Sequence, residues 1–229
     1  MGGRRGGAVS ERAKREFFAR PAAEVARRLI GQRLVRVSAG VRLSGIIVET
    51  EAYVGVKDGA SHAFNGRRTA RNESMYGSPG TAYVYFTYGM HFCFNVSCAR
   101  EGDPQAVLIR AVAAEEGTGV LRQNRGRAVS DSELCRGPGS LCRAMAINRE
   151  LDGEALATSD RLWIDVERPR AHAASKLVRC PRIGIGESAG EWRGAPLRWY
   201  LRGAASVSVR DRSDRVLFGG RLAGRGSTA

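Results

Sequence analysis

Residues 81–98 read TAYVYFTYGMHFCFNVSC, and this stretch decides the fold. Two runs rich in aromatic and β-branched residues flank Tyr88-Gly89-Met90, a pattern typical of a β-hairpin. A two-residue loop would mix apolar and polar side chains on each face, whereas a three-residue loop separates them. We therefore predict the three-residue loop, because a slip of one residue would move the whole apolar set into water. The apolar face then consists of Val84, Phe86, Phe92, Phe94 and Val96.

This register also fixes the second face of the hairpin and its tip. It places Tyr83 beside Asn95 and Tyr85 beside Cys93, with Tyr88 at the tip. An aromatic side chain at the tip of a hairpin in a basic protein is a candidate wedge between stacked base pairs. The alternative is an exposed tyrosine with no role.

The segments around the hairpin extend it into a larger sheet. Strands are predicted over residues 33–38, 41–53, 106–114, 161–167, 182–186 and 196–203. Helices are predicted over residues 21–29 and 138–147, each beginning at a proline, which suits the first helical turn. Residues 54–80 are rich in Gly, Arg, Asn and Ser and read as a long loop, which in a compact domain is usually functional. We expect an α+β fold, a single domain with a mainly antiparallel sheet, a protruding β-hairpin and flanking helices.

The two ends of the chain differ from its middle. Residues 1–10 and 219–229 are rich in glycine and lack periodicity, so we predict tails there and one domain over residues 11–218. No run approaches the roughly 18 apolar residues that a membrane span needs, and the N-terminus has no apolar core of a secretory signal. A cytoplasmic protein without a membrane partner is the expectation.

The charge is strongly positive. The 229 residues include 37 Lys and Arg against 23 Asp and Glu, a net charge of +14, and only Lys14, Lys57 and Lys176 are lysines. Such an excess indicates a polyanionic partner, with nucleic acid favoured over a membrane surface. Arginine suits phosphate because its planar fork bonds two oxygens at once. The arginine content could instead follow from the base composition of the genome.

The cysteines do not have the spacing of a metal site. They are Cys93, Cys98, Cys135, Cys142 and Cys180. Their number is odd and no pair has the C-x-x-C spacing that zinc sites use. We expect five reduced, mostly buried thiols and no metal.

Residues whose side chains could take part in binding or catalysis are concentrated between positions 49 and 88. Five of the six tyrosines lie there, together with Glu49, Glu51, His62 and the basic segment 65–72. Aromatic rings stack on nucleic-acid bases and arginine holds the backbone. Glu49 and Glu51 are two apart on a strand, so their side chains point the same way and we expect that both cannot be core. A carboxylate at a strand end beside aromatic rings is a candidate general base, and a solvated strand end is the alternative.

An ordered set of motifs spanning about residues 20–205 resembles the alkyladenine-type 3-methyladenine DNA glycosylases. The matching segments are VETEAYVG (48–55), TARNESMYGSPGTAYVYFTYGMHFCFNVS (69–97), AVLIRA (106–111), ELCRGPGSLCRAMAIN (133–148), RIGIG (182–186) and GEWRGAPLRWYLRG (190–203). The resemblance implies a base-excision-repair enzyme that cleaves the bond between a damaged purine and deoxyribose. Residues 115–132 match poorly, and His91 stands where some relatives carry tyrosine, so accessory DNA contacts and substrate preference are open.

The resemblance also implies a role for each matching residue. Glu51 is similar to the base that activates the attacking water, and Arg110 to the residue that helps hold this water. The backbone carbonyl of Ile183 is expected to be a third contact of the water. No cofactor is implied.

The remaining matches concern the damaged base. Tyr53 resembles one wall of the base pocket, and His62 and Tyr85 resemble the opposite wall. Tyr88 resembles the wedge that fills the gap left by the flipped nucleotide. Asn95 resembles the residue whose side chain clashes with the 2-amino group of normal guanine.

These roles predict a monofunctional glycosylase. A glycosylase that also nicks the strand generally uses an amine nucleophile, and no lysine falls in a matched catalytic motif. The expected partner is double-stranded DNA containing alkylated or deaminated purines such as 3-methyladenine, 7-methylguanine, hypoxanthine and ethenoadenine, bound by a monomer. Two other classes remain open: a non-catalytic basic module that binds nucleic acid, and a hydrolase or transferase that uses the same fold on a small molecule.

Overall fold

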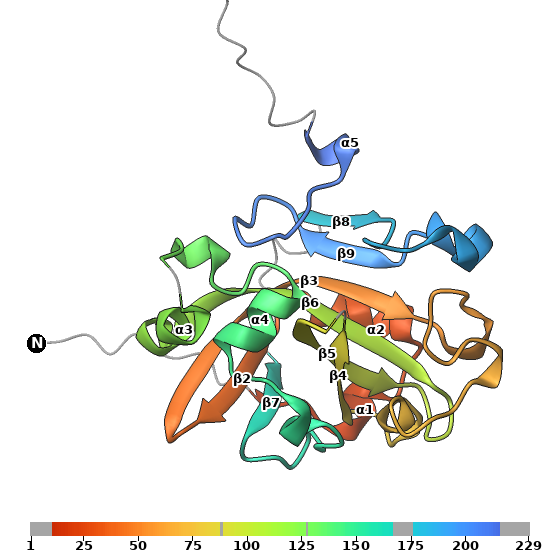
Figure 1. The fold of residues 1–229 in the computed structure, drawn as a ribbon, viewed down its shortest axis with the longest axis horizontal. Helices are drawn as coiled ribbons and strands as arrows, with labels where there is room; N and C mark the ends of the chain where they lie inside the picture. Colours follow the sequence, from red (N-terminus) through yellow and green to blue (C-terminus); the bar gives the residue numbers. More distant parts are fainter. Residues whose placement is uncertain (1–10, 88, 127, 167–175, 216–229) are drawn as a thin grey trace, which may run out of the picture.

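The fold is built on one antiparallel sheet. The computed structural model describes residues 11–87, 89–126, 128–166 and 176–215, and within these ranges every strand pairing is antiparallel. The strands are β1 (Glu11–Arg12), β2 (Arg33–Ser38), β3 (Val41–Tyr53), β4 (Ala82–Thr87), β5 (His91–Cys98), β6 (Gln105–Glu116), β7 (Leu162–Val166), β8 (Leu177–Cys180) and β9 (Arg198–Leu201). Their order is β1-β7-β2-β3-β6-β5-β4, and β9 joins β3 to β8. The expected α+β fold with a mainly antiparallel sheet is confirmed (Figure 1).

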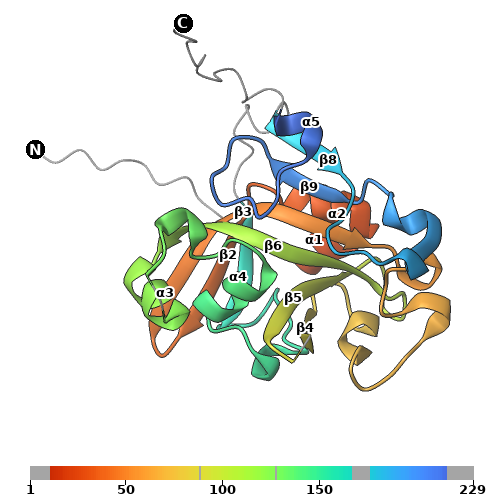
Figure 2. The ribbon, with the colours of Figure 1, turned by 45° about the horizontal axis from the view of Figure 1, so that its top comes forward.

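Short helices pack against this sheet. They are α1 (Arg15–Phe18), α2 (Ala22–Leu29), α3 (Thr118–Arg125), α4 (Pro138–Ala144) and α5 (Arg212–Arg215). Helix α2 contacts β3 and β6, α4 contacts β5 and β6, and α3 contacts α4 (Figures 1 and 2). Helix α2 begins after Pro21 and buries Ala22, Val25, Ala26 and Leu29, the spacing of one helical face. No helix of the described ranges has the length and apolar character needed to cross a membrane.

The hairpin of β4 and β5 has the predicted register. Phe86 lies opposite Phe92, Tyr85 opposite Cys93, and Thr87 opposite His91. The inner half of the apolar face is buried as expected, at Val84, Phe94 and Val96. The outer half is not, since Phe86 is 46% exposed and Phe92 is only partly buried. The hairpin therefore extends beyond the core, and its tip residue Tyr88 lies outside the described residues.

One predicted strand was wrong, and two elements were not predicted. Residues 182–186 form no strand, because the backbone N–H of Ile183 bonds a side chain and Gly184 has a φ of +72°. The neighbouring strand is β8, which the sequence reading missed. Helix α3 was also missed, in the part of the chain where the resemblance is weak. The predicted tails, residues 1–10 and 219–229, lie outside the described residues.

The long segment between β3 and β4 does not form regular sheet structure. It contains three 3₁₀ turns, Gly55–Lys57, Phe64–Gly66 and Glu73–Tyr76. Figures 1 and 2 show this orange segment beside the blue segment that precedes β9, and Arg182 is ion-paired to Asp58 across the two. The two segments together extend beyond one end of β3, where the chain reaches Glu51 and Tyr53.

Candidate active site

The two central strands carry bulges beside the candidate general base. The register of β3 against β6 shifts between Ile47 and Glu49 and again between Glu49 and Thr50. The first shift leaves Val48 without an opposite residue, and the second leaves Arg110 of β6 without one. A bulge bends the strand and re-aims side chains. It brings the Arg110 guanidinium against the carboxylates of β3.

The Glu51 carboxylate receives three hydrogen bonds. The backbone N–H of Ile183 donates to Oε1 at 2.7 Å, and Tyr53 Oη and Arg110 Nη1 donate to Oε2 at 3.1 and 3.2 Å. Glu51 has no exposed surface, so these donors replace the water that a buried carboxylate loses. This converging set of donors suits the ionised form, which is the form that can accept a proton. The expected role of the Ile183 carbonyl remains a prediction.

A cavity of about 310 Å³ lies next to this carboxylate. Its walls include the sequence-predicted residues Tyr53, His62, Tyr85, Asn95, Arg110 and Ile183. Glu51 is not among the described residues that line the cavity, but each of its three donors is. The carboxylate therefore lies directly behind the cavity wall.

Three aromatic rings form one side of the cavity. Tyr83 and Tyr85 stack with ring centroids 5.1 Å apart, and the His62 ring meets Tyr85 edge-on at 4.6 Å. His62 Nδ1 lies 2.8 Å from Tyr83 Oη. Partial burial of the ring, followed by the charges of Arg71 and Arg67, lowers the pKa of His62 to about 4, which keeps the ring neutral at pH 7. The sequence reading assigned no role to Tyr83, although the hairpin register places it on the same face as Tyr85.

Asn95 lies on the neighbouring strand. Its side chain is 3% exposed and its Nδ2 donates to the backbone carbonyl of Tyr83 at 3.2 Å. Asn95 also pairs with Leu108 of β6, so it is fixed from both flanking strands. The Asn95 amide is therefore a fixed part of the cavity wall.

The Tyr53 ring rests on a buried ion pair that the sequence reading did not find. Arg182 donates from Nη1 and Nη2 to the two oxygens of Asp58 at 2.5 and 2.8 Å, and both side chains have no exposed surface. The Arg182 guanidinium carbon lies 4.7 Å from the centre of the Tyr53 ring. Burial, and then the negative charge of Glu51, raises the pKa of Tyr53 well above its usual value, so its hydroxyl keeps its proton and can donate.

The expectation that Glu49 and Glu51 could not both be buried was wrong. Neither carboxylate has exposed surface. Glu49 Oε1 lies 2.9 Å from Arg198 Nη1 and 3.4 Å from Arg110 Nε, and its Oε2 accepts the Ser208 N–H at 2.7 Å. Paired arginines, which come from distant parts of the chain, make this burial possible. Burial would lower the pKa of Arg110, but the Glu51 and Glu49 carboxylates outweigh it and raise that pKa overall.

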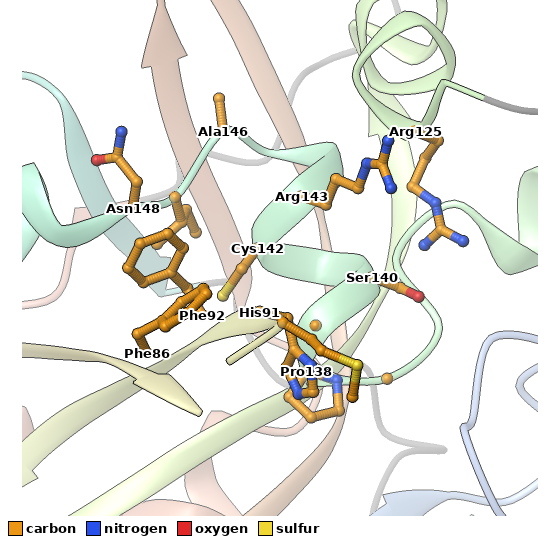
Figure 3. A pocket seen from close by; sticks show the side chains of 14 residues that line it. Phe86, His91, Phe92, Arg125, Pro138, Ser140, Cys142, Arg143, Ala146 and Asn148 are labelled. Atoms are coloured by element: carbon orange, nitrogen blue, oxygen red, sulfur yellow. The ribbon is translucent and has the colours of Figure 1, made fainter. Parts of the chain in front are cut away.

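A second cavity of about 800 Å³ opens on the other face of the hairpin (Figure 3). Phe86 and Phe92 line one side of it, and Arg125 and Arg143 line the opposite side. His91 contributes to both cavities and packs against Gly139, where an added Cβ would lie 2.7 Å from the ring. The hairpin thus separates two hollows.

Comparison with known proteins identifies the family. Residues 16–205 match the family described as methylpurine-DNA glycosylase (MPG). The chain belongs to this family. The match confirms both the resemblance noted from the motifs and the expected enzyme class, a DNA glycosylase.

Curated relatives support the match. The DNA-3-methyladenine glycosylase of Homo sapiens is 45% identical over 206 residues, which cover 86% of this chain and 68% of the human protein. The protein of the same name in Mus musculus is 46% identical and covered to 61%. A putative 3-methyladenine DNA glycosylase of Desulfitobacterium hafniense is 44% identical over 207 residues, or 87% of this chain and 100% of its own length. The chain therefore spans 61–68% of these two mammalian relatives and all of the bacterial one.

The remaining predictions concern the cysteines, the hairpin tip and the roles of the site residues. All five cysteines are free and buried, as expected. Tyr88, the predicted wedge, lies outside the described residues. The other predicted site residues gather at one cavity, and their roles in the reaction are proposals.

Proposed function

We propose that this enzyme flips an alkylated or deaminated purine out of double-stranded DNA and hydrolyses its N-glycosidic bond with water activated by Glu51. The observation that carries the proposal is the position of Glu51. Its carboxylate lies behind the wall of an aromatic cavity, held by donors that themselves line the cavity. A buried anion next to a base-sized aromatic cavity combines the two parts that the reaction needs, a proton acceptor and a binding site for a planar ring.

The base would bind by stacking. The rings of Tyr53, Tyr85 and His62 line the cavity, and each stacked base typically gains about 1–3 kcal/mol from one aromatic side chain. A neutral His62 presents no charge to repel a cationic alkylated base. A damaged or mismatched base also costs less to extrude, which is a first source of selectivity.

The chemical step would follow displacement of one donor. The Tyr53 hydroxyl lies 3.1 Å from Glu51 Oε2, and Tyr53 also lines the cavity. Movement of this hydroxyl on binding admits a water to Glu51. The water oxygen forms a bond to C1′, the bond from C1′ to the base nitrogen breaks with its electron pair leaving on the base, and Glu51 accepts the proton of the water. The anionic carboxylate also stabilises the positive charge that develops on the sugar.

Selection against normal guanine would come from Asn95. Its side chain is buried in the cavity wall and held by the Tyr83 carbonyl. A purine with a 2-amino group would clash with the Asn95 amide, and the amide cannot move away without breaking its hydrogen bond to the Tyr83 carbonyl. Purines without that group, such as 3-methyladenine and hypoxanthine, avoid the contact.

DNA would bind across the hairpin. Tyr88 at its tip is the proposed wedge, and the exposed arginines Arg67, Arg68 and Arg71 lie beside the base cavity, in the loop that carries His62. On the other face, Arg125 and Arg143 line the second cavity (Figure 3). We expect a monomer to make these contacts with cellular DNA in the cytoplasm, at the nucleoid in a bacterial cell.

We propose that the enzyme does not nick the strand. Lys14, Lys57 and Lys176 are the lysines of the chain, and none is among the described residues that line either cavity. No lysine among the described residues is therefore placed to attack C1′. Water is the nucleophile that remains, and the product is an abasic site.

The test is base release from defined duplexes. Purified protein is incubated with duplexes carrying 3-methyladenine, 7-methylguanine, hypoxanthine or ethenoadenine, and with undamaged duplex as the control. We expect release of at least one damaged purine, an intact strand, and no covalent adduct after borohydride reduction. Binding without release of any base would support a nucleic-acid-binding module instead. Weak binding that does not depend on salt would support a small-molecule enzyme, because phosphate contacts give a steep salt dependence.

A further inference from the structure

The second buried carboxylate, Glu49, has no role in the mechanism above. It is fully buried, two residues before Glu51 and on the same side of β3. A buried carboxylate is costly unless it is paired, and a sheet position is more simply filled by an apolar residue. The contacts of Glu49 indicate what the charge does there.

Glu49 and Glu51 hold the same arginine from two sides. Arg110 Nη1 donates to Glu51 Oε2 at 3.2 Å, whereas Arg110 Nε lies 3.4 Å from Glu49 Oε1 in an ion-pair contact without a hydrogen bond. Arg110 Nη2 lies 3.5 Å from Ser208 Oγ, and the Ser208 N–H donates to Glu49 at 2.7 Å. Glu49 therefore contacts Arg110 directly and also bonds Ser208, whose hydroxyl contacts the same guanidinium. Without Glu49, the direction of the guanidinium would depend on Glu51 and one long hydroxyl contact.

Glu49 also connects to the segment that bonds Glu51 on its other oxygen. Arg198 Nη1 lies 2.9 Å from Glu49 Oε1, and Arg198 Nε donates to the Pro181 carbonyl at 2.9 Å. Pro181 is two residues before Ile183, whose N–H donates to Glu51. Two of the three donors to Glu51 are thus held in place through Glu49.

The charges at this centre balance. Among the described residues, the ion pairs join two carboxylates, Glu49 and Glu51, to two guanidinium groups, Arg110 and Arg198. Bond cleavage creates positive charge on the sugar next to this cluster. A neutral cluster does not oppose that charge, whereas a cluster that lacks the Glu49 charge would be positive and would oppose it.

We infer that Glu49 is a positioning residue that acts through Arg110, holding its guanidinium toward Glu51 and compensating its charge so that the sugar cation can form. This inference rests on the proposed function, since it requires Glu51 to be the base. Glu49 does not line the base cavity among the described residues, so its loss should slow the reaction without weakening capture of the damaged base.

The first experiment separates rate from binding. Single-turnover base release and the Kd for lesion duplex are measured for wild type, Glu49→Gln and Glu51→Gln. We expect Glu49→Gln to lower the rate constant by up to about 10²-fold, the loss that a small misplacement of a reacting group can cause, with the Kd unchanged. An unchanged rate in Glu49→Gln while Glu51→Gln is inactive overturns the inference and leaves the proposed function intact. A wild type that releases no base overturns the proposed function itself.

The matched control is Asp214→Asn. Asp214 is also a fully buried carboxylate, paired with Arg202 Nε at 2.8 Å and Tyr200 Oη at 2.9 Å, but it is not among the described residues that line the base cavity. We expect both variants to lose stability in thermal unfolding, because each removes the charge of a fully buried carboxylate that is paired with arginine. We expect a loss of rate, measured on folded protein, only in Glu49→Gln. Equal losses of rate in both variants would show a merely structural role and overturn the inference.

The second experiment is a double-mutant cycle with Arg110→Gln, which removes both the guanidinium and its charge. If Glu49 acts through Arg110, the rate lost on Glu49→Gln should be several-fold smaller in the Arg110→Gln background than in wild type. A full, independent loss in that background overturns the inference. Should Glu49→Gln not fold, Glu49→Asp takes its place, since it keeps the charge but shortens the reach to Arg110. Glu49→Asp at the wild-type rate then contradicts the positioning role, and a reduced rate at unchanged Kd supports it.

Discussion

The Asp58–Arg182 ion pair offers a sharp test of how the base cavity is held. Asp58→Asn removes the charge but keeps the shape, leaving the fully buried Arg182 guanidinium without its counterion. Removing one partner of a buried pair typically costs about 3–5 kcal/mol. Asp58 accepts the Val54 N–H on Oδ2 and the Ala60 N–H on Oδ1, so the single oxygen of asparagine can keep only one of these two bonds. For a chain of this length a loss in this range corresponds to a fall in melting temperature of about 6–20 °C.

The same change should affect the reaction. Arg182 packs against the Tyr53 ring and immediately precedes Ile183, whose N–H bonds Glu51. A displaced Arg182 therefore moves both a wall of the cavity and a donor to the candidate base. We expect a weaker Kd for lesion duplex together with a lower single-turnover rate, unlike Glu49→Gln, which should change the rate alone.

Urea unfolding followed by circular dichroism, with linear extrapolation to water, measures the stability change. Asp131→Asn is the control, because the Arg122–Asp131 pair is exposed on both sides and such pairs contribute about 0–1 kcal/mol. If Asp58→Asn costs no more than Asp131→Asn, the buried pair does not hold the cavity wall and the reasoning is refuted.

Three further predictions concern other residues. Asn95→Ala should allow release of normal guanine at a measurable rate in a base-release assay, and continued exclusion of guanine would contradict the proposed clash. Partial burial and the charges of Arg71 and Arg67 lower the pKa of His62 to about 4, so the unfolded chain binds this proton more readily than the folded protein does. The stability that His62 contributes is therefore present above pH 6.5 and is lost as the pH falls toward 4. Calorimetry should show a smaller fall in melting temperature over this range for His62→Gln than for wild type, and parallel curves would contradict it. Burial raises the pKa of the Cys98 and Cys142 thiols, so iodoacetamide at pH 8 should label them only after unfolding in urea, whereas fast labelling of native protein would contradict their burial.

Alternation along the chain was sufficient to predict the hairpin. The three-residue loop was chosen because it places Val84 and Phe94 on one face of the hairpin and Asn95 on the other, and the structure has that register. The same argument failed at the outer end, where Phe86 is exposed, because alternation says which side chains share a face but not how far the core extends. Strands β2, β3, β7 and β9 were found from their apolar and β-branched residues.

The buried ion pairs and hydrogen bonds that hold the candidate site in place could not be predicted from local patterns. Glu49 and Glu51 were expected not both to be buried, and the burial of Glu49 depends on Arg198, 149 positions away, and on a bulge that turns Arg110 inward. Asp58 and Arg182 are 124 positions apart, and neither sits in a motif that marks an ion pair. Residues 182–186 alternate like a strand, but the Ile183 N–H is used by Glu51 instead of a sheet partner. Each error arose from a contact distant in sequence.

The central claim is that the Glu51 carboxylate takes the proton of the attacking water, and one measurement tests it most directly. Single-turnover release of a damaged purine is compared between wild type and Glu51→Gln, with the Kd for the same duplex measured in parallel. The amide keeps the shape of the side chain but cannot accept the proton, so we predict a loss of rate of about 10²-fold or more with binding largely retained, within the contribution of a general base. A Glu51→Gln enzyme that releases the base at the wild-type rate would contradict the account.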